Sequence, residues 1–360
     1  PIDSVSVWGG EENIPPVYGQ IFCAVKPSGG YTLTPAQKEK LISEVIKPIS
    51  VLTVTPTIVD PDYTYVKINT KVLYDAKKTT LTGGQIKSQV LSRINQFSTD
   101  TLNTFNSVFK LPELISYIQS ADPSIITNES SIRLQKKFYP KLNSRATYIF
   151  DFGVPLQRNY YNAGLNSSPD FSESDATATS GVREGIYFEE VPTTTGGVAT
   201  INIVNQGFGY TKVPTVTISG DGEGATAYAV LASGRVNSIV VTNPGYNYTE
   251  AFVTITPQDG DTSGSLAYAA PVLEGVEGTL RTYYYLNNIK TILDANAGTI
   301  DYSTGRVTLT DFSPLSINND LGRFTISVVP DSTIVSSTYN KIIATDSFDP
   351  EAITVNVSVQ

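Results

Sequence analysis

Two pairs of acidic side chains are the residues of this chain whose types and spacing come nearest to catalytic chemistry. Asp60 and Asp62 flank a proline, and Glu189 and Glu190 are sequence neighbours. Two carboxyl groups can hydrolyse a glycosidic bond when one acts as acid and the other as base or nucleophile. Asp-Pro-Asp is typical of a turn, however, and neighbouring residues of a strand face opposite ways. We therefore predict no catalytic residue, and we expect both glutamates to lie in solvent beside a loop.

The amino-acid composition excludes most other kinds of catalytic site and metal site. The 360 residues include no histidine and one cysteine, Cys23. Histidine-based triads and histidine-ligated zinc are therefore impossible within the chain, and so is an intrachain disulfide. The apolar neighbours of Cys23 favour a small buried hydrophobic residue over a reactive thiol. We predict that the protein is not an enzyme and holds no cofactor.

The glycine-rich segment at 220–224 carries two acids and lacks the Lys-Ser/Thr of a phosphate-binding loop, so we interpret it as a turn. Asp221, Glu223, Asp259 and Asp261 have the oxygen ligands that calcium prefers. Neither an EF-hand nor a calcium-binding nonapeptide repeat accompanies these acids. We therefore predict no metal site.

The charge balance bears on the class of partner. Lys and Arg total 25 against 34 Asp and Glu, giving a net charge of -9, and no segment gathers the basic residues that phosphate binding requires. Apolar runs such as 49–54 are far shorter than the roughly 20 residues of a membrane span. We expect neither nucleic acid nor a membrane as partner. Because the chain begins at Pro1 and has no methionine, we expect a fragment or trimmed product.

Residues 1–155 have the pattern of a mixed α and β domain. Thr34, Thr82 and Pro112 predict the starts of three helices. The apolar residues expected on the buried faces of these helices are Leu41, Ile42, Val45, Ile46, Ile86, Val90, Ile94, Phe97, Leu114, Ile115 and Ile118. Strands are predicted at 18–25, 49–59, 63–75, 131–138 and 146–152. This order argues for an α+β layer with the helices on one face of a sheet.

Two segments beyond this domain match one another. INIVNQGFGYT at 201–211 corresponds to IVVTNPGYNYT at 239–249, and the similarity continues through VTI and AYA strings. Each unit holds about three short strands with glycine turns, so the stretch 191–275 predicts an all-β module of two tandem repeats. Its tyrosines Tyr210, Tyr246 and Tyr248 either pack between the repeats or form a sugar-stacking surface.

The chain before and after this module shows the same mixed pattern of helices and strands. A small, polar stretch at 156–190 predicts a linker or long loop. From 276 to 360 the α+β pattern returns, with a hairpin at 300–309 and a terminal alternating strand at 353–359. We therefore expect residues 1–155 and 276–360 to form one host domain into which the module is inserted.

Several strings of the host domain resemble those of a known family, the baseplate wedge proteins of T4-like contractile-tailed phages, whose core is related to baseplate J-like proteins. These strings are SVSVWGGEEN at 4–13, PPVYG at 15–19, VKP at 25–27, VTP at 54–56, VDPDY at 59–63, DPSI at 122–125 and the hairpin at 302–309. The resemblance covers roughly residues 1–155 and 275–360 and corresponds to the C-terminal part of the family protein. The module departs from it and is similar to Gly/Tyr/Thr-rich repeats in virion proteins of marine cyanophages.

The resemblance implies a structural subunit of the virion's tail baseplate that assembles in the host cytoplasm. Copies of such a protein pair, contact other baseplate wedge proteins and join wedges into a ring around the tail hub. The residues that we expect at an interface are Trp8, Tyr283, Tyr284, Tyr285, Ile289, Ile292 and Leu293. The rival hypothesis is a host-glycan-binding or tail-fibre-type adhesion module that uses Tyr210, Tyr246 and Tyr248.

Overall fold

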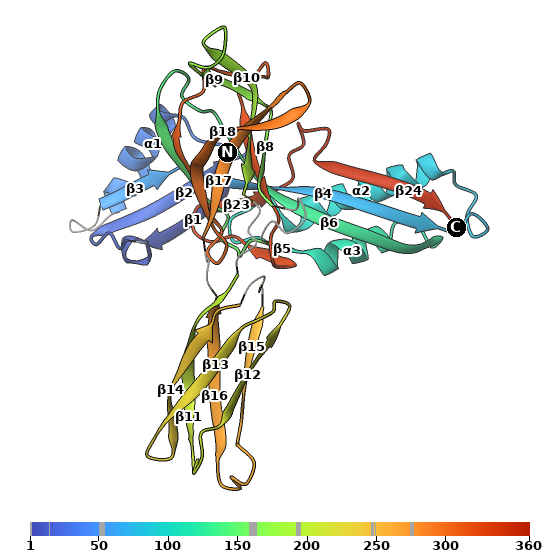
Figure 1. The fold of residues 1–360 in the computed structure, drawn as a ribbon. Coiled ribbons are helices and arrows are strands. Elements are labelled where there is room, and N and C mark those ends of the chain that lie inside the picture. The colour runs from blue at the N-terminus through green and yellow to red at the C-terminus, as the bar shows by residue number, and fades with distance from the viewer. Residues whose placement is uncertain are drawn as a thin grey trace.

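The computed structural model describes residues 2–13, 15–49, 55–157, 164–191, 196–245, 248, 250–273 and 277–360. Strands account for 52% of the chain and helices for 14%, so the protein is mostly β with a few helices. In Figure 1 the strands form a wide upper body, and one group of strands projects from it. This mixture is compatible with the predicted α+β class, although strands dominate it.

A three-stranded sheet lies at the N-terminus. Its strands are β1 (Ile2–Gly9), β2 (Gln20–Pro27) and β3 (Thr55–Val59), with β1 antiparallel and β3 parallel to the central β2. Short helical segments follow β1 and β2: η1 (Gly10–Glu12), α1 (Pro35–Leu41), the π-helical turn η2 (Ile42–Ile46) and the 3-10 turn η3 (Lys47–Ile49). The side chain of Thr34 caps α1 as predicted. Of the predicted strand 49–59, residues 55–59 form β3 and residue 49 ends η3, while residues 50–54 lie outside the described part of the chain.

The apolar stripe expected along the first helix is not buried. Neither α1 nor η2 contains a buried residue, and Val45 is exposed. The stripe has the right spacing, but the only strand with which η2 makes substantial contact among the described elements is the short edge strand β3. Helical periodicity therefore predicted the element correctly and its burial wrongly.

In the part of the chain that the structure describes, one sheet of thirteen strands forms the centre of the upper body. Its main path runs β23-β4-β6-β21-β8-β10-β17-β18-β19-β7, with β24 beside β4 and with β9 joining β10 to β20. The strands are β4 (Asp62–Tyr74), β6 (Ile125–Phe138), β7 (Ala146–Asp151), β8 (Asn166–Ser168), β9 (Phe171–Ser174), β10 (Val182–Glu190), β17 (Glu277–Leu286), β18 (Ile289–Asp301), β19 (Arg306–Phe312), β20 (Ser316–Ile317), β21 (Phe324–Val328), β23 (Lys341–Ala344) and β24 (Ile353–Val359). Strands from before and after the projecting part are therefore intermixed within one sheet.

Two helices, α2 (Gly83–Thr101) and α3 (Leu111–Gln119), pack on this sheet near β24 and β6 (Figure 1). Thr82 caps α2 through a reciprocal pair of contacts with Gln85. Ile86, Val90, Ile94 and Phe97 are fully buried, as their spacing predicted. A small two-stranded sheet of β5 (Val108–Lys110) and β22 (Ile334–Ser336) lies beside them.

The expected linker at 156–190 is largely a sheet instead. The described part of it contains β8, β9 and β10, and Phe171 and Phe188 stack in the main core at 5.5 Å between ring centroids. Small polar residues occupy the solvent-exposed side of these short strands, so the composition of the segment is typical of a loop. The few apolar side chains between them decide the structure because they fill the core.

The projecting part has its own apolar cluster. A four-stranded sheet runs β13-β14-β11-β16, and a ribbon of β12 and β15 packs on it. The strands are β11 (Val198–Phe208), β12 (Thr215–Gly220), β13 (Thr226–Ala232), β14 (Arg235–Asn243), β15 (Ala251–Thr256) and β16 (Ser265–Leu273). Each of the two matching sequence segments supplies three strands, and the four strand pairings among the described residues all join one segment to the other.

The two places where this part joins the upper body are close together. Glu190 near the end of β10 pairs with Leu280 of β17, and Val191 N–H donates to Thr279 O at 2.9 Å. The chain therefore leaves and re-enters the main sheet on neighbouring antiparallel strands.

Candidate assembly interface

The three consecutive tyrosines that the sequence singled out lie in β17. Tyr283 pairs with Tyr187 of β10 on one side and with Ile292 of β18 on the other. Tyr187 and Tyr283 stack at 5.7 Å, and Tyr283 meets Tyr285 edge to face at 5.8 Å. Because alternate residues of a strand share a face, Tyr283 and Tyr285 lie on one side of the sheet.

Charged side chains lie next to these tyrosine rings. Glu189 accepts hydrogen bonds from Arg281 at 2.8 Å and from Lys290 at 2.5 Å, and the Lys290 ammonium lies 4.0 Å from the centre of the Tyr283 ring. Burial and the charge of Glu189 raise the pKa of Tyr283 to about 12. The phenol therefore stays protonated at neutral pH and can donate a hydrogen bond to a partner.

The end of this hairpin is exposed and apolar. Asn287 and Asn288 both have positive φ, as a two-residue hairpin turn requires, and they join Leu286 to Ile289. Tyr285, Leu286, Ile289 and Ile292 are exposed. Leu286 follows Tyr285 in the strand and pairs with Ile289, so these two side chains lie on the opposite face of the hairpin from Tyr283 and Tyr285. The set that covers both faces of this end, which we call the tyrosine patch, is Tyr187, Tyr283, Tyr285, Leu286, Ile289 and Ile292.

The other three expected interface residues lie elsewhere. Trp8 is only 8% exposed, because it stacks on Phe22 at 5.7 Å and meets Tyr339 at 5.5 Å. Tyr284 is buried beneath the Arg183 guanidinium, 4.2 Å from its ring centre. Leu293 packs partly buried against the main core. Trp8, Tyr284 and Leu293 therefore support the fold of the described chain and present little surface to a partner.

The tyrosines of the glycan hypothesis are internal. Tyr210 and Tyr248 are 4% and 2% exposed, and Tyr246 lies outside the described residues. The ring of Tyr210 fills the space beside Gly264, and that of Tyr248 fills the space beside Gly222. A buried ring has no free face for a sugar, so the burial of Tyr210 and Tyr248 favours the packing alternative.

The acidic pairs have structural contacts. Asp60 pairs with Lys38 at 2.7 Å and Asp62 with Lys136 at 2.6 Å. Glu189 and Glu190 face opposite ways, but the expectation that both are solvated is wrong. Glu189 belongs to the ion pairs described above.

Glu190 is fully buried. Its carboxylate accepts the Tyr302 hydroxyl at 2.5 Å and the Leu165 N–H at 3.0 Å. Burial is possible because these donors replace the hydrogen bonds that water would make. No local pattern could have indicated this burial, because Tyr302 is 112 residues away.

Asp261 uses its oxygens on the backbone. It accepts N–H groups from Thr211, Lys212, Ser263 and Gly264 at 2.9–3.3 Å. Burial opposes ionisation, but these donors outweigh it and hold the pKa of the carboxyl below its usual range. Among the described residues, no three His, Cys, Asp or Glu side chains group as a metal site.

Sequence reasoning missed a second exposed apolar surface, on the N-terminal sheet. Val5, Val7 and Ile21 are exposed on the face opposite Trp8. The alternation of β1 was visible in the sequence, but both of its faces carry apolar side chains. The pattern therefore did not show which face would be covered.

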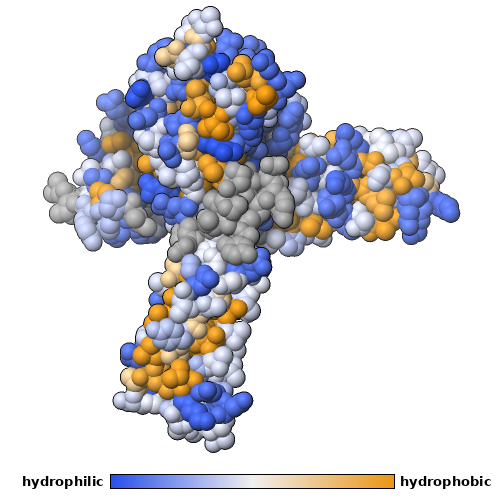
Figure 2. Space-filling model, viewed as in Figure 1, coloured by the Kyte–Doolittle hydropathy of each residue, from blue (hydrophilic) through white to orange (hydrophobic). Residues whose placement is uncertain are grey.

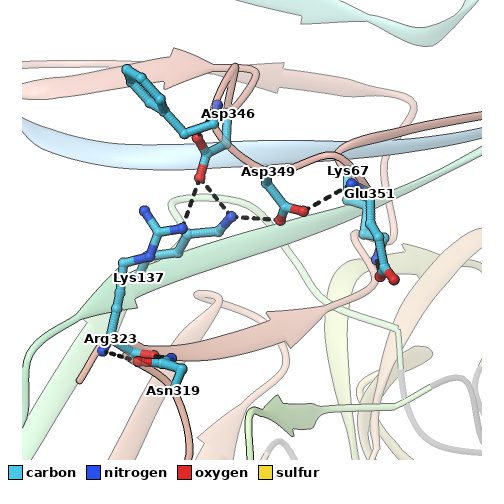
Figure 3. A network of polar contacts seen from close by, with 8 residues as sticks. Lys67, Lys137, Asn319, Arg323, Asp346, Asp349 and Glu351 are labelled. Carbon is cyan, nitrogen blue, oxygen red and sulfur yellow. Dashed lines mark hydrogen bonds and ion pairs between the residues drawn. The ribbon is translucent and has the colours of Figure 1, made fainter. Parts of the chain in front are cut away.

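An ion network holds the segment before β24 against the sheet (Figure 3). Lys137 of β6 donates to Asp346 at 2.7 Å and to Asp349 at 2.8 Å, and Arg323 approaches Asp346 at 3.4 Å. The side chains of Lys137 and Asp346 are 4% and 1% exposed. The two contacts of Lys137 join parts of the chain more than 200 residues apart.

Comparison with known proteins places the N-terminal third of the chain. Residues 1–59 match the family described as baseplate structural protein gp6, C-terminal domain I, and residues 62–137 match C-terminal domain III. The baseplate wedge protein gp6 of Enterobacteria phage T4 is 30% identical over 119 residues, which are 33% of this chain and 18% of the relative. The match therefore covers less than a fifth of the relative's length.

These matches confirm the resemblance to T4-like baseplate wedge proteins and, with it, the expected place in the virion's tail baseplate. They give no sign of a cyanophage origin, which stays a prediction. No helix among the described residues is long and apolar enough to cross a membrane.

Proposed function

We propose that this chain is part of a structural subunit of a contractile phage tail baseplate wedge, which pairs with a second copy and joins wedges into a ring around the hub. The observation that carries the proposal is the match of residues 1–137 to two gp6 C-terminal domains. Other baseplate wedge proteins are the further partners that this role requires.

The tyrosine patch suits a contact between copies. Tyrosine contributes a large contact area with few rotatable bonds, and it is enriched where protein interfaces bury their centres. The ion pairs of Glu189 with Arg281 and Lys290 lie at its border, where a polar rim is expected. A chain of net charge -9 repels its copies, so an uncharged centre favours pairing.

The absence of catalysis is part of this proposal. Asp60, Asp62, Glu189 and Glu190 all have a hydrogen-bonding or ionic partner, and these contacts fix them in the fold. We expect no turnover of peptidoglycan or neutral polysaccharide above buffer. Turnover that disappears in the Asp62→Ala or Glu189→Ala variant would contradict a purely structural role.

The test of pairing is the mass of the chain in solution. Light scattering at tens of micromolar should show a dimer, and Ile289→Lys should shift it to monomer, because a charge would be buried in the patch. Leu321→Lys is the matched control, since Leu321 is 68% exposed and Ile289 is 69% exposed. A wild-type chain that remains monomeric at this concentration would refute pairing through these residues.

A further inference from the structure

A small cleft lies where the N-terminal sheet meets the main sheet. Figure 2 shows apolar surface on the projecting part and near β24, but a small ligand needs a hollow with groups that fix its orientation. The cleft has a volume of about 220 Å³. Its lining includes Tyr31, Tyr63 and Tyr65 together with the ion pair of Asp3 and Lys26.

The three tyrosines give the cleft an aromatic surface. Tyr63 and Tyr65 are alternate residues of β4 and stack at 6.0 Å between ring centroids. Tyr31 meets Tyr63 edge to face at 5.3 Å, and the Tyr63 hydroxyl donates to Tyr31 O at 3.0 Å. Tyr31 is 43% exposed, so its ring offers a flat apolar surface to a ligand.

The hydroxyl group of Tyr65 has no hydrogen-bond partner among the described residues, although the side chain is only 9% exposed. In that part of the chain the enclosed side-chain atoms without a partner are Gln89 Oε1 and Ser124 Oγ, so the Tyr65 hydroxyl reaches open space. Because Tyr65 lines the cleft, the cleft supplies that space. Burial above all raises the pKa of Tyr65, so the phenol stays protonated and can donate a hydrogen bond to a ligand.

The ion pair places a donor and an acceptor side by side in the same cleft. Lys26 Nζ donates to Asp3 Oδ2 at 2.8 Å and to Asn103 O at 2.6 Å. An ammonium group has three protons, so one is left over from these contacts within the described chain. The other carboxylate oxygen, Asp3 Oδ1, accepts no hydrogen bond from the described residues. The two charges cancel, which favours a neutral ligand.

The lining contributed by the segment after β23 is held in place. Thr345 and Ser347 line the cleft on either side of Asp346 in the chain. Asp346 is bound by Lys137 and Arg323 in the ion network of Figure 3. A site whose walls are already fixed loses little conformational freedom when a ligand binds.

We propose that this cleft binds a neutral sugar residue. The apolar C–H face of a pyranose ring packs on Tyr31, and its hydroxyl groups, each both donor and acceptor, pair with Asp3 and Lys26. A further hydroxyl accepts the proton of Tyr65. The volume of about 220 Å³ is below the roughly 300–1,000 Å³ of sites for drug-sized ligands, so it suits a single ring.

A protein side chain fits these groups less well. A charged side chain would meet both an attractive and a repulsive charge in the ion pair. A proline ring could pack on Tyr31 but would leave Lys26, Asp3 and the Tyr65 hydroxyl without new partners. Unpaired polar groups that lose water on binding lower affinity.

Saturation-transfer NMR of the full chain tests the proposal with the methyl glycosides of glucose, galactose, mannose and N-acetylglucosamine. At about 10 mM, a concentration that populates a complex with a Kd of about 1 mM, at least one glycoside should show transfer to its ring C–H protons. Tyr31→Ala should weaken that binding about tenfold, because the stacking surface is lost. Tyr18→Ala is the matched control, since Tyr18 is 80% exposed and lies outside the cleft.

A conservative variant tests the hydrogen-bonding group separately. Tyr65→Phe keeps the ring and removes only the hydroxyl, so the fold should persist while affinity falls about threefold to tenfold. An affinity equal to that of the wild type would contradict the role given to Tyr65. The solution mass of all three variants should match that of the wild type, so the outcome is separate from the test of pairing.

Two results would overturn the sugar site. One is the absence of transfer to all four glycosides, and the other is equal transfer in the wild type and in Tyr31→Ala, which would place binding elsewhere. If a decaproline peptide binds the wild type and loses affinity in Tyr31→Ala while the glycosides do not bind, the cleft is a protein-docking site and the inference is wrong.

Discussion

The ion network around Lys137 makes a quantitative prediction about stability. Replacing Asp346 by Asn removes one carboxylate from a lysine whose side chain is 4% exposed. The amide oxygen can still accept the N–H of Phe348, which donates to Asp346 at 2.9 Å. The change therefore isolates the lost charge with little change of shape.

The expected loss follows from burial. Breaking a buried ion pair by removing one partner costs about 3–5 kcal/mol, because a charge is left uncompensated. Asp349 remains 2.8 Å from Lys137, so we expect the lower end, about 3 kcal/mol. For a domain of this size that lowers the melting temperature by about 6 °C. Lys137→Met should cost more, since it leaves the buried carboxylate of Asp346 with the more distant Arg323 and takes the lysine from Asp349 as well.

The assay is urea and thermal unfolding followed by far-ultraviolet circular dichroism. Glu129→Gln is the control, because Glu129 and Lys71 form an ion pair at 3.6 Å with side chains 81% and 69% exposed. Exposed pairs contribute about 0–1 kcal/mol, so this variant should match the wild type. An Asp346→Asn protein no less stable than Glu129→Gln would refute the reasoning.

Three further predictions concern other contacts. Asp261→Asn should destabilise the projecting part at neutral pH. Because the folded carboxyl has a lowered pKa, its contribution to the free energy of unfolding is present above the ordinary pKa of 3.8 and is lost as the pH falls below it. The stabilities of wild type and variant should therefore converge in acid. A gap that stays constant with pH would contradict this. Tyr302→Phe should lower the free energy of unfolding by about 1.5–3 kcal/mol, since Glu190 loses a charged hydrogen bond, and urea denaturation that shows no change would contradict it. Joining Val191 to Glu277 with a short Gly/Ser linker should leave a cooperatively unfolding upper body, because Val191 already contacts Thr279; a molten product in calorimetry would show that the projecting part supports the main core.

Local signals explain what could be predicted from the sequence. Thr82 and Gln85 fix the start of α2, and the spacing of its apolar residues fixes the buried face. The terminal strand β24 occupies the predicted residues 353–359 because it alternates cleanly between apolar and polar side chains. In both elements the interactions that decide the structure lie within a few residues.

Long-range contacts explain what could not be predicted. The segment around Phe171 and Phe188 forms strands because both rings pack against Phe312 and Phe324, which lie more than 120 residues later in the chain. Trp8 was expected at an interface because it is large and apolar, yet Phe22 and Tyr339 cover it within the chain. Residue type alone does not show whether a neighbour from the same chain will fill the space.

The pairing scheme of the projecting part bears on whether its two halves can be separated. Each strand pairing among its described residues joins one sequence segment to the other. Each segment therefore supplies the hydrogen-bonding edges that the other needs, and the two act as one folding unit. Deleting either segment leaves open strand edges rather than a smaller domain.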